Sequence, residues 1–151
     1  MEVKYAIYRI AGDPDGYTYS LKLSRDEGDY QLFVRERRNR EADVEYRIYE
    51  VDPSLLENVY DIAMEFSLDE IADRPAGPFV SANAGVSQLK VGFEDGESLS
   101  ISSYLDMNMK ELEGFHKITH LLVSLDDRIS FLESGIEDED GHLSAYEGAL
   151  S

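Results

Sequence analysis

The chain has 151 residues, of which 42% are hydrophobic and 30% are charged, a composition typical of one folded domain large enough to bury a core. Its 32 acidic and 14 basic side chains give a formal net charge of −18 at pH 7. Residues 1–50 hold 9 basic and 11 acidic side chains, whereas residues 51–151 hold 5 and 21. A field of this sign repels nucleic acid and anionic lipid and attracts basic surfaces.

The absence of cysteine excludes disulfides, thiolate metal sites and cysteine nucleophiles, and it is consistent with a reducing compartment. The N-terminal residues lack the basic and apolar regions of a signal peptide. The longest aliphatic run, Leu121 to Val123, is far too short to span a membrane. We therefore expect a cytoplasmic protein that is neither exported nor inserted into a membrane.

The first fifty residues are predicted to form strands, because apolar and polar side chains alternate with period two in short segments separated by turn residues. In the clearest segment Tyr17, Tyr19, Leu21 and Leu23 share one face. The predicted strands are Val3 to Ile10, Tyr17 to Ser24, Tyr30 to Arg35 and Val44 to Glu50. Their short connections favour an antiparallel meander.

Two helices are predicted from apolar residues at helical spacing. The first opens at Asp52 and Pro53, because Asp caps free amides and Pro tolerates the first helical position, and it extends to Phe66. The second runs from about Asn108 to Leu125, with Gly114 as a local weakness. Each helix has one apolar face that can pack on a sheet.

Between the helices, the segment from Ser67 to Gly85 is rich in Pro and Gly and is predicted to be a long connection with one helical turn at Leu68 to Ala72. Connections of this length are often functional or mobile. Strand patterns return at Val86 to Phe93 and at Glu97 to Ser102. Asp95 and Gly96 between them are typical of a hairpin turn, because both tolerate positive φ.

The predicted order β-β-β-β-α-β-β-α indicates an α+β fold, a mostly antiparallel sheet with two helices packed on one face. We expect residues 1–126 to form this single domain. Apolar residues thin out afterwards, and Glu137 to Asp140 form a run of like charges. Residues 127–151 are therefore predicted to be an acidic tail, partly disordered or loosely docked through Ile129, Phe131 and Leu132.

Metal sites are weakly indicated. Glu113, His116 and His120 lie within about 60° of one another on the polar face of the second predicted helix, but the internal glutamate of a zincin motif is missing. His142 could be a further ligand only if the tail folded back. Residues 136–147 partly match a calcium-loop pattern through Asp138, Asp140, Gly141 and Glu147, although the first position is Ile136. We predict no bound metal or cofactor.

Catalytic signatures are absent from the sequence. The serines at 98, 100, 102 and 103 do not stand in a nucleophile elbow, and no glycine motif for phosphate binding occurs. Carboxylates are so frequent that their closeness in the sequence does not identify a catalytic acid and base. The pattern favours a protein that is not an enzyme.

Two further groups of residues are candidates for partner binding. Arg35, Arg37, Arg38 and Arg40 surround a predicted hairpin tip, with Arg47 on the next strand. This cluster is a solvated hairpin end or, alternatively, receives the acidic tail or an acidic patch of a second copy. Tyrosines such as Tyr17 and Tyr19 lie on predicted strands and would form a recognition surface if one sheet face were uncovered.

These features favour a small, acidic, non-enzymatic protein that binds a basic protein partner, comparable in composition to an inhibitor or immunity-type protein. Nucleic acid and membranes are not expected as partners. One alternative is a metal-dependent binder or enzyme that uses Glu113, His116 and His120 or residues of the connection 67–85. Another is a subunit that self-associates through an exposed strand edge to form a homo-oligomer.

Overall fold

The computed structural model of the protein describes residues 3–11, 14–26, 28–71, 86–103 and 107–146. The elements, in chain order, are β1 (Val3–Ala11), β2 (Thr18–Asp26), β3 (Asp29–Arg37), β4 (Val44–Glu50), α1 (Ser54–Glu65), the 3-10 helix η1 (Leu68–Glu70), β5 (Val86–Phe93), β6 (Ser98–Ser102), α2 (Met109–Ser124), β7 (Glu133–Glu137) and β8 (Leu143–Ala145).

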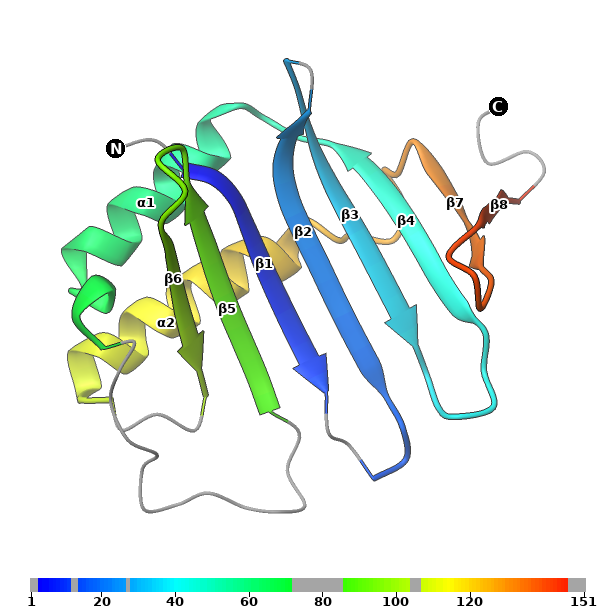
Figure 1. The fold of residues 1–151 in the computed structure, drawn as a ribbon, viewed down its shortest axis with the longest axis horizontal. Coiled ribbons are helices and arrows are strands. Elements are labelled where there is room, and N and C mark those ends of the chain that lie inside the picture. The colour runs from blue at the N-terminus through cyan, green and yellow to red at the C-terminus, as the bar shows by residue number, and fades with distance from the viewer. Residues whose placement is uncertain (1–2, 12–13, 27, 72–85, 104–106, 147–151) are drawn as a thin grey trace.

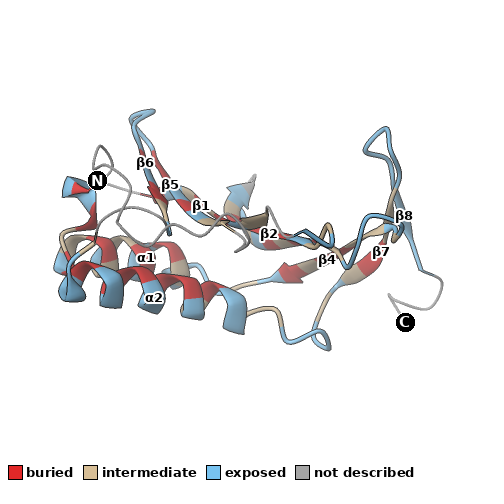
Figure 2. Ribbon diagram, turned by 90° about the horizontal axis from the view of Figure 1, so that it is seen from below, coloured by how far each residue is buried: buried red, intermediate tan, exposed pale blue. Residues whose placement is uncertain are grey.

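The strands form an 8-stranded sheet in the order β6-β5-β1-β2-β3-β4-β7-β8 (Figure 1). Every neighbouring pair is antiparallel, and β1 lies between β2 and β5. Both helices lie on one side of the sheet, beneath its β6-to-β2 part, and the β4-β7-β8 part extends beyond them (Figure 2). The α+β class and the mostly antiparallel sheet predicted from the sequence are confirmed.

The core lies between the sheet and the helices because alternate strand residues point toward the helix layer. Cross-strand registers align these apolar positions from strand to strand, as with Tyr8, Leu21 and Val34. The buried residues of this inner face are Ala6, Tyr8, Tyr19, Leu21, Leu23, Leu32, Val34, Tyr49, Leu89, Val91, Leu99 and Ile101. The helices contribute Leu56, Val59, Ala63, Phe115, Ile118 and Leu122.

Helix α1 begins where the sequence predicts. The Asp52 carboxylate accepts a hydrogen bond of 2.8 Å from the Ser54 amide, and Pro53 occupies the N-cap position. Pro at the start of a helix removes only an amide that would have no partner there. The predicted turn at Leu68 to Ala72 is observed as the shorter η1, and residues 72–85 of the long connection lie outside the described residues.

Helix α2 begins with a capping box, in which the Asn108 side chain accepts from the Glu111 amide and the Glu111 carboxylate accepts from the Asn108 amide. Inside the helix, Gly114 allows the end of α1 to approach closely. A Cβ atom at position 114 would lie 2.4 Å from Cβ of Phe66 and 2.7 Å from its Cγ. Gly114 is therefore a packing requirement between the helices.

The hairpin between β5 and β6 also forms as predicted. The Gly96 amide donates to the Phe93 carbonyl at 3.1 Å, and Gly96 has a φ of 89°. This positive φ is the reason that a turn residue without a side chain stands there. Among the described residues, neither helix is long and apolar enough to cross a membrane.

The segment after residue 126 differs from the predicted tail. Residues 133–137 form β7, which pairs with β4, and β8 pairs with β7 as the last strand of the sheet. The Leu132 amide donates to the Ile48 carbonyl at 2.7 Å, and the Phe131 ring packs edge-on against Tyr49. Backbone hydrogen bonds hold this segment to the sheet. It therefore does not need alternating apolar and polar side chains, and its sequence shows no such alternation. Residues 147–151 lie outside the described residues.

Replacing Gly114 with Ala should destabilise the protein, although Ala favours a helix by about 1 kcal/mol. The added Cβ would overlap Phe66, and overpacking of this kind costs about 1–3 kcal/mol. Urea unfolding should show a net loss of up to about 2 kcal/mol in the free energy of unfolding. A more stable Gly114→Ala variant would contradict the close approach of the two helices.

Candidate functional site

A cluster of charged side chains lies where α2 ends against the inner face of the sheet. The Arg47 guanidinium, from β4, donates to both oxygens of Asp126 at 2.9 and 2.8 Å. It also donates to the Glu36 carboxylate, from β3, at 3.1 Å. All three side chains are almost inaccessible, with exposed fractions of 8% for Arg47, 2% for Asp126 and 4% for Glu36.

Three tyrosines and a second arginine complete the cluster. The hydroxyl groups of Tyr19 and Tyr49 donate to Asp126, and that of Tyr17 donates to Glu36. Arg128 donates to Glu36 at 2.9 Å, and its backbone amide donates to the Tyr49 hydroxyl at 3.0 Å. Among the described residues, no buried side-chain nitrogen or oxygen lacks a hydrogen-bond partner. The cluster is thus fully satisfied and pairs two carboxylates with two arginines.

The cluster holds each of its groups in its ordinary ionisation state at neutral pH. Burial raises the pKa of Asp126, but hydrogen bonds from Arg47, Tyr49 and Tyr19 outweigh it, so the net pKa is lowered. The pKa of Glu36 is also lowered, because hydrogen bonds from Arg128, Tyr17 and Arg47 outweigh the effect of burial. Burial and the adjacent carboxylates raise the pKa values of Tyr17 and Tyr49 to about 12. None of these groups is poised to exchange a proton near pH 7, so the cluster is structural.

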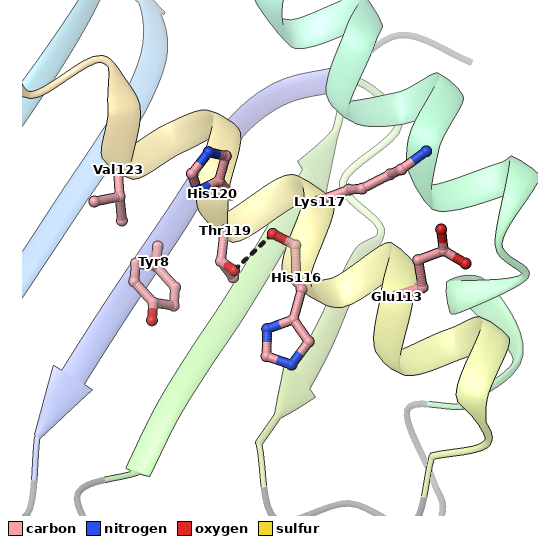
Figure 3. Close-up of a pocket in the computed structure, with 7 residues that line it drawn as sticks. All are labelled: Tyr8, Glu113, His116, Lys117, Thr119, His120 and Val123. Atoms are coloured by element: carbon pink, nitrogen blue, oxygen red, sulfur yellow. Dashed lines mark hydrogen bonds between the residues drawn. The ribbon is translucent and has the colours of Figure 1, made fainter.

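The polar face of α2 borders an open hollow of about 570 Å³ (Figure 3). The hollow is lined by Tyr8, Glu113, His116, Lys117, Thr119, His120 and Val123. Glu113, His116 and His120 are exposed, as the helical spacing predicts. Their side chains point in different directions in Figure 3, so the structure does not bring the three together as a preformed metal site.

The turn between β7 and β8 gathers the side chains of the partial calcium-loop pattern. Among the described residues, only Asp138, Asp140 and His142 bring three ligand atoms within 4.8 Å of one another. All three are exposed, and the Asp138 carboxylate already accepts the amides of Asp140 and His142. Ile136 lies in β7 and Glu147 is outside the described residues. The carboxylate therefore serves to shape the turn.

The arginines of the β3–β4 hairpin have separate surroundings. Arg35 forms an ion pair of 2.8 Å with Glu137, at the start of the acidic run. Arg37 donates to the carbonyls of Ala42 and Arg40, and Arg38 is exposed. Arg47, which the sequence groups with them, is buried in the cluster beside Asp126. Among the described ion pairs of these arginines, the one between Arg35 and Glu137 reaches the acidic segment of the same chain.

The tyrosines divide between the two faces of the sheet. Tyr8, Tyr19 and Tyr49 are buried toward the helices. Tyr46 lies on the opposite face, where it stacks on Phe33 and donates to Glu133 at 2.7 Å. Tyr17 and Tyr19 are bound to the inner cluster, whereas Arg35 lies on the outer face, so the structure does not unite these candidates in one binding surface.

An exposed row of carboxylates on the first helix was not identified from the sequence. Glu57, Asp61 and Glu65 lie four residues apart on α1, opposite the buried Leu56, Val59 and Ala63, and Asp69 and Glu70 follow on η1. We call these five carboxylates the acidic ridge. Residues 48–73 contain no Lys or Arg, and none of the described ion pairs involves the ridge. The spacing of four was the signal that could have revealed it.

Comparison with known proteins assigns no function to the chain. No family model matches the sequence, and no curated protein matches it significantly. The function must therefore be inferred from the surfaces themselves.

Changing Asp126 to Asn should reduce the free energy of unfolding by about 3 kcal/mol at pH 7, because it leaves Arg47 buried with one carboxylate fewer. The folded state lowers the pKa of Asp126, so the ionised carboxylate stabilises the fold above about pH 4. This contribution is lost as the pH falls through the lowered pKa. The difference in the free energy of unfolding between wild type and Asp126→Asn should therefore become smaller only below about pH 4.

The matched control is Asp127→Asn, since Asp127 is exposed and accepts hydrogen bonds from Ile129 and Ser130, which are also exposed. An asparagine oxygen can accept the same bonds, so this variant should change stability little. Urea unfolding from pH 3 to pH 7 measures both effects. An Asp126→Asn variant as stable as wild type at pH 7 would contradict the structural role of the cluster.

Proposed function

We propose that the protein is a non-enzymatic binding protein whose acidic ridge engages a basic surface of a partner protein, in the manner of an inhibitor or immunity-type protein. The observation that carries this proposal is the ridge itself: Glu57, Asp61 and Glu65 on one exposed helix face, continued by η1, with no cation among residues 48–73. The net charge of −18 supports a partner of opposite charge.

The ridge is costly to the isolated fold, which supports a role in binding. Like charges four residues apart destabilise a helix by about 0.2–0.5 kcal/mol per pair, and α1 contains two such pairs in succession. Elsewhere the chain neutralises carboxylates with arginines, as at Glu94 with Arg25 and Glu137 with Arg35. A partner that supplies Lys or Arg would relieve the repulsion along α1.

The geometry of α1 sets the kind of partner that fits. The ridge is on the convex surface of a helix, and four helical residues span about 6 Å. A shallow basic groove with cations at comparable spacing would contact all three carboxylates of α1. Such contacts speed association and give specificity, and they weaken as salt screens them. The same charge disfavours nucleic acid and anionic membranes as partners, and we place this binding in the cytoplasm.

The test compares wild type with the ridge variant Glu57→Gln/Asp61→Asn/Glu65→Gln in affinity capture from a lysate of the native source at low and moderate salt. We expect wild type to retain a basic protein that moderate salt releases. Three surface contacts of about 0.5 kcal/mol each predict about tenfold weaker binding of that protein by the ridge variant.

The control is Glu41→Gln/Glu139→Gln/Asp140→Asn, which removes the same charge from exposed positions at the β4 and β7 end of the sheet. It should bind the retained protein as wild type does. An equal loss of binding in the ridge variant and in the control would mean that only net charge matters. Equal retention by wild type and the ridge variant would contradict a role for the ridge.

A further inference from the structure

The outer face of the sheet carries a second unmatched charge pattern. Both helices lie on the opposite side, and none of the described helices covers this face (Figure 2). The strand registers place Lys90, Arg9, Lys22 and Arg35 on the outer face of four adjacent strands, β5, β1, β2 and β3. Lys90 and Lys22 both lie beside Ile7, and Arg9 and Arg35 both lie beside Ser20. The cations therefore form a zigzag across the strands.

The strand positions next to Arg9, Lys22 and Lys90 hold no carboxylate, in a chain with more than twice as many acidic as basic residues. The outward neighbours in these registers are Tyr5, Ile7, Ser20, Ser24, Gln31, Phe33, Gln88, Ser100 and Ser102. Arg9, Lys22 and Lys90 take part in none of the described ion pairs, and Arg35 pairs only at the edge, with Glu137. Three cations are therefore left without a described carboxylate partner.

The surface around the cations suits contact with carboxylates. A hollow of about 280 Å³ lies over β6, β5 and β1, with Arg9 and Lys90 beside the polar side chains of Gln88, Ser100 and Ser102. These groups donate hydrogen bonds to carboxylate oxygens. Ile7 and Tyr5 supply apolar area between the charges. The Nζ atom of Lys22 lies 5.4 Å from the centre of the Tyr5 ring. The face therefore presents fixed donors on a rigid sheet.

We propose that this outer face binds the acidic ridge of a second copy of the chain. The proposal rests on the proposed function, that the ridge binds a basic surface, and adds that the chain itself carries one such surface. The three carboxylates on α1 can face the three cations that have no described carboxylate partner. Carboxylates four residues apart on a helix repeat about every 6 Å. Cations on neighbouring strands are offset by about 5 Å across the sheet and about 7 Å along it, so they lie about 8 Å apart, and long Lys and Arg side chains can span the difference.

The arrangement of the two surfaces determines the type of assembly. The ridge belongs to the helix layer and the cations to the opposite face of the sheet, so one copy uses its ridge while its neighbour uses its sheet (Figure 2). Such a head-to-tail contact is not self-complementary, and it produces rings or open chains of copies. An open chain of copies therefore keeps one free ridge at one end and one free sheet face at the other until the assembly closes.

The net charge of −18 on each copy opposes this contact, and salt decides the balance. At physiological ionic strength charges are screened beyond about 8 Å, so the remote repulsion is weakened while ion pairs in contact persist. Self-association should therefore be strongest at moderate salt. It should weaken both in very dilute buffer, where the copies repel, and near 1 M salt, where the contacts themselves are screened.

The test is sedimentation velocity at moderate salt on wild type, on the ridge variant and on a sheet variant, Arg9→Gln/Lys90→Gln. Wild type should form concentration-dependent species larger than a dimer. Each variant alone should self-associate at least tenfold more weakly. An equimolar mixture should form a dimer and nothing larger, because the intact sheet of one variant binds the intact ridge of the other.

Two control variants of matched charge separate this contact from a general effect. Glu41→Gln/Glu139→Gln/Asp140→Asn for the ridge and Arg38→Gln/Lys110→Gln for the sheet should associate as wild type does. A wild type that stays monomeric at all concentrations and salts, or variants that still self-associate, would overturn the proposal. The two proposals can also be told apart. If wild type is monomeric in sedimentation, and if in the lysate experiment only the ridge variant, and not its control, fails to retain a basic protein, this inference fails and the proposed function stands.

Discussion

The bidentate pair between Arg47 and Asp126 is the interaction on which the rest of the structure depends. It joins Asp126, two residues after the end of α2, to the middle of β4, at the point where the helix layer stops covering the sheet. Beyond that boundary, β7 and β8 continue the sheet without a helix beneath them. Burying these charges is expensive, and apolar residues could often replace them without loss of stability. We infer that the pair is retained because it defines one geometry for the end of α2.

The same cluster explains why the surplus charge lies outside. Arg47 and Arg128 neutralise Glu36 and Asp126, so the cluster itself contributes no net charge. The acidic ridge lies on the helix side of the molecule, whereas the outer sheet face carries Arg9, Lys22 and Lys90 without a described carboxylate partner. Our two proposals, binding through the ridge and assembly through the outer sheet face, rest on that division.

Periodicity in the sequence was sufficient to predict both helices, the first six strands and the common face of Tyr19 and Leu21, and the turn residues predicted the turn at Gly96. It could not predict β7, because residues 133–137 are held by backbone pairing with β4 and show no apolar alternation. Nor could it pair Tyr19 with Asp126, which lie 107 residues apart. Arg47 looked like one more arginine of an exposed hairpin, and only the tertiary contact shows that it is buried. Helical spacing placed His116 and His120 on one face but could not supply the directions of their rings.

A double-mutant cycle between Arg47 and Asp126 tests the central claim most directly. Urea unfolding of wild type, Arg47→Met, Asp126→Asn and the double variant gives the coupling energy between the two side chains. If the pair joins α2 to the sheet, each single variant leaves a buried charge with too few partners, and the coupling energy should be at least about 2 kcal/mol in favour of the pair. Additivity of the two single effects to within about 0.5 kcal/mol would contradict the claim.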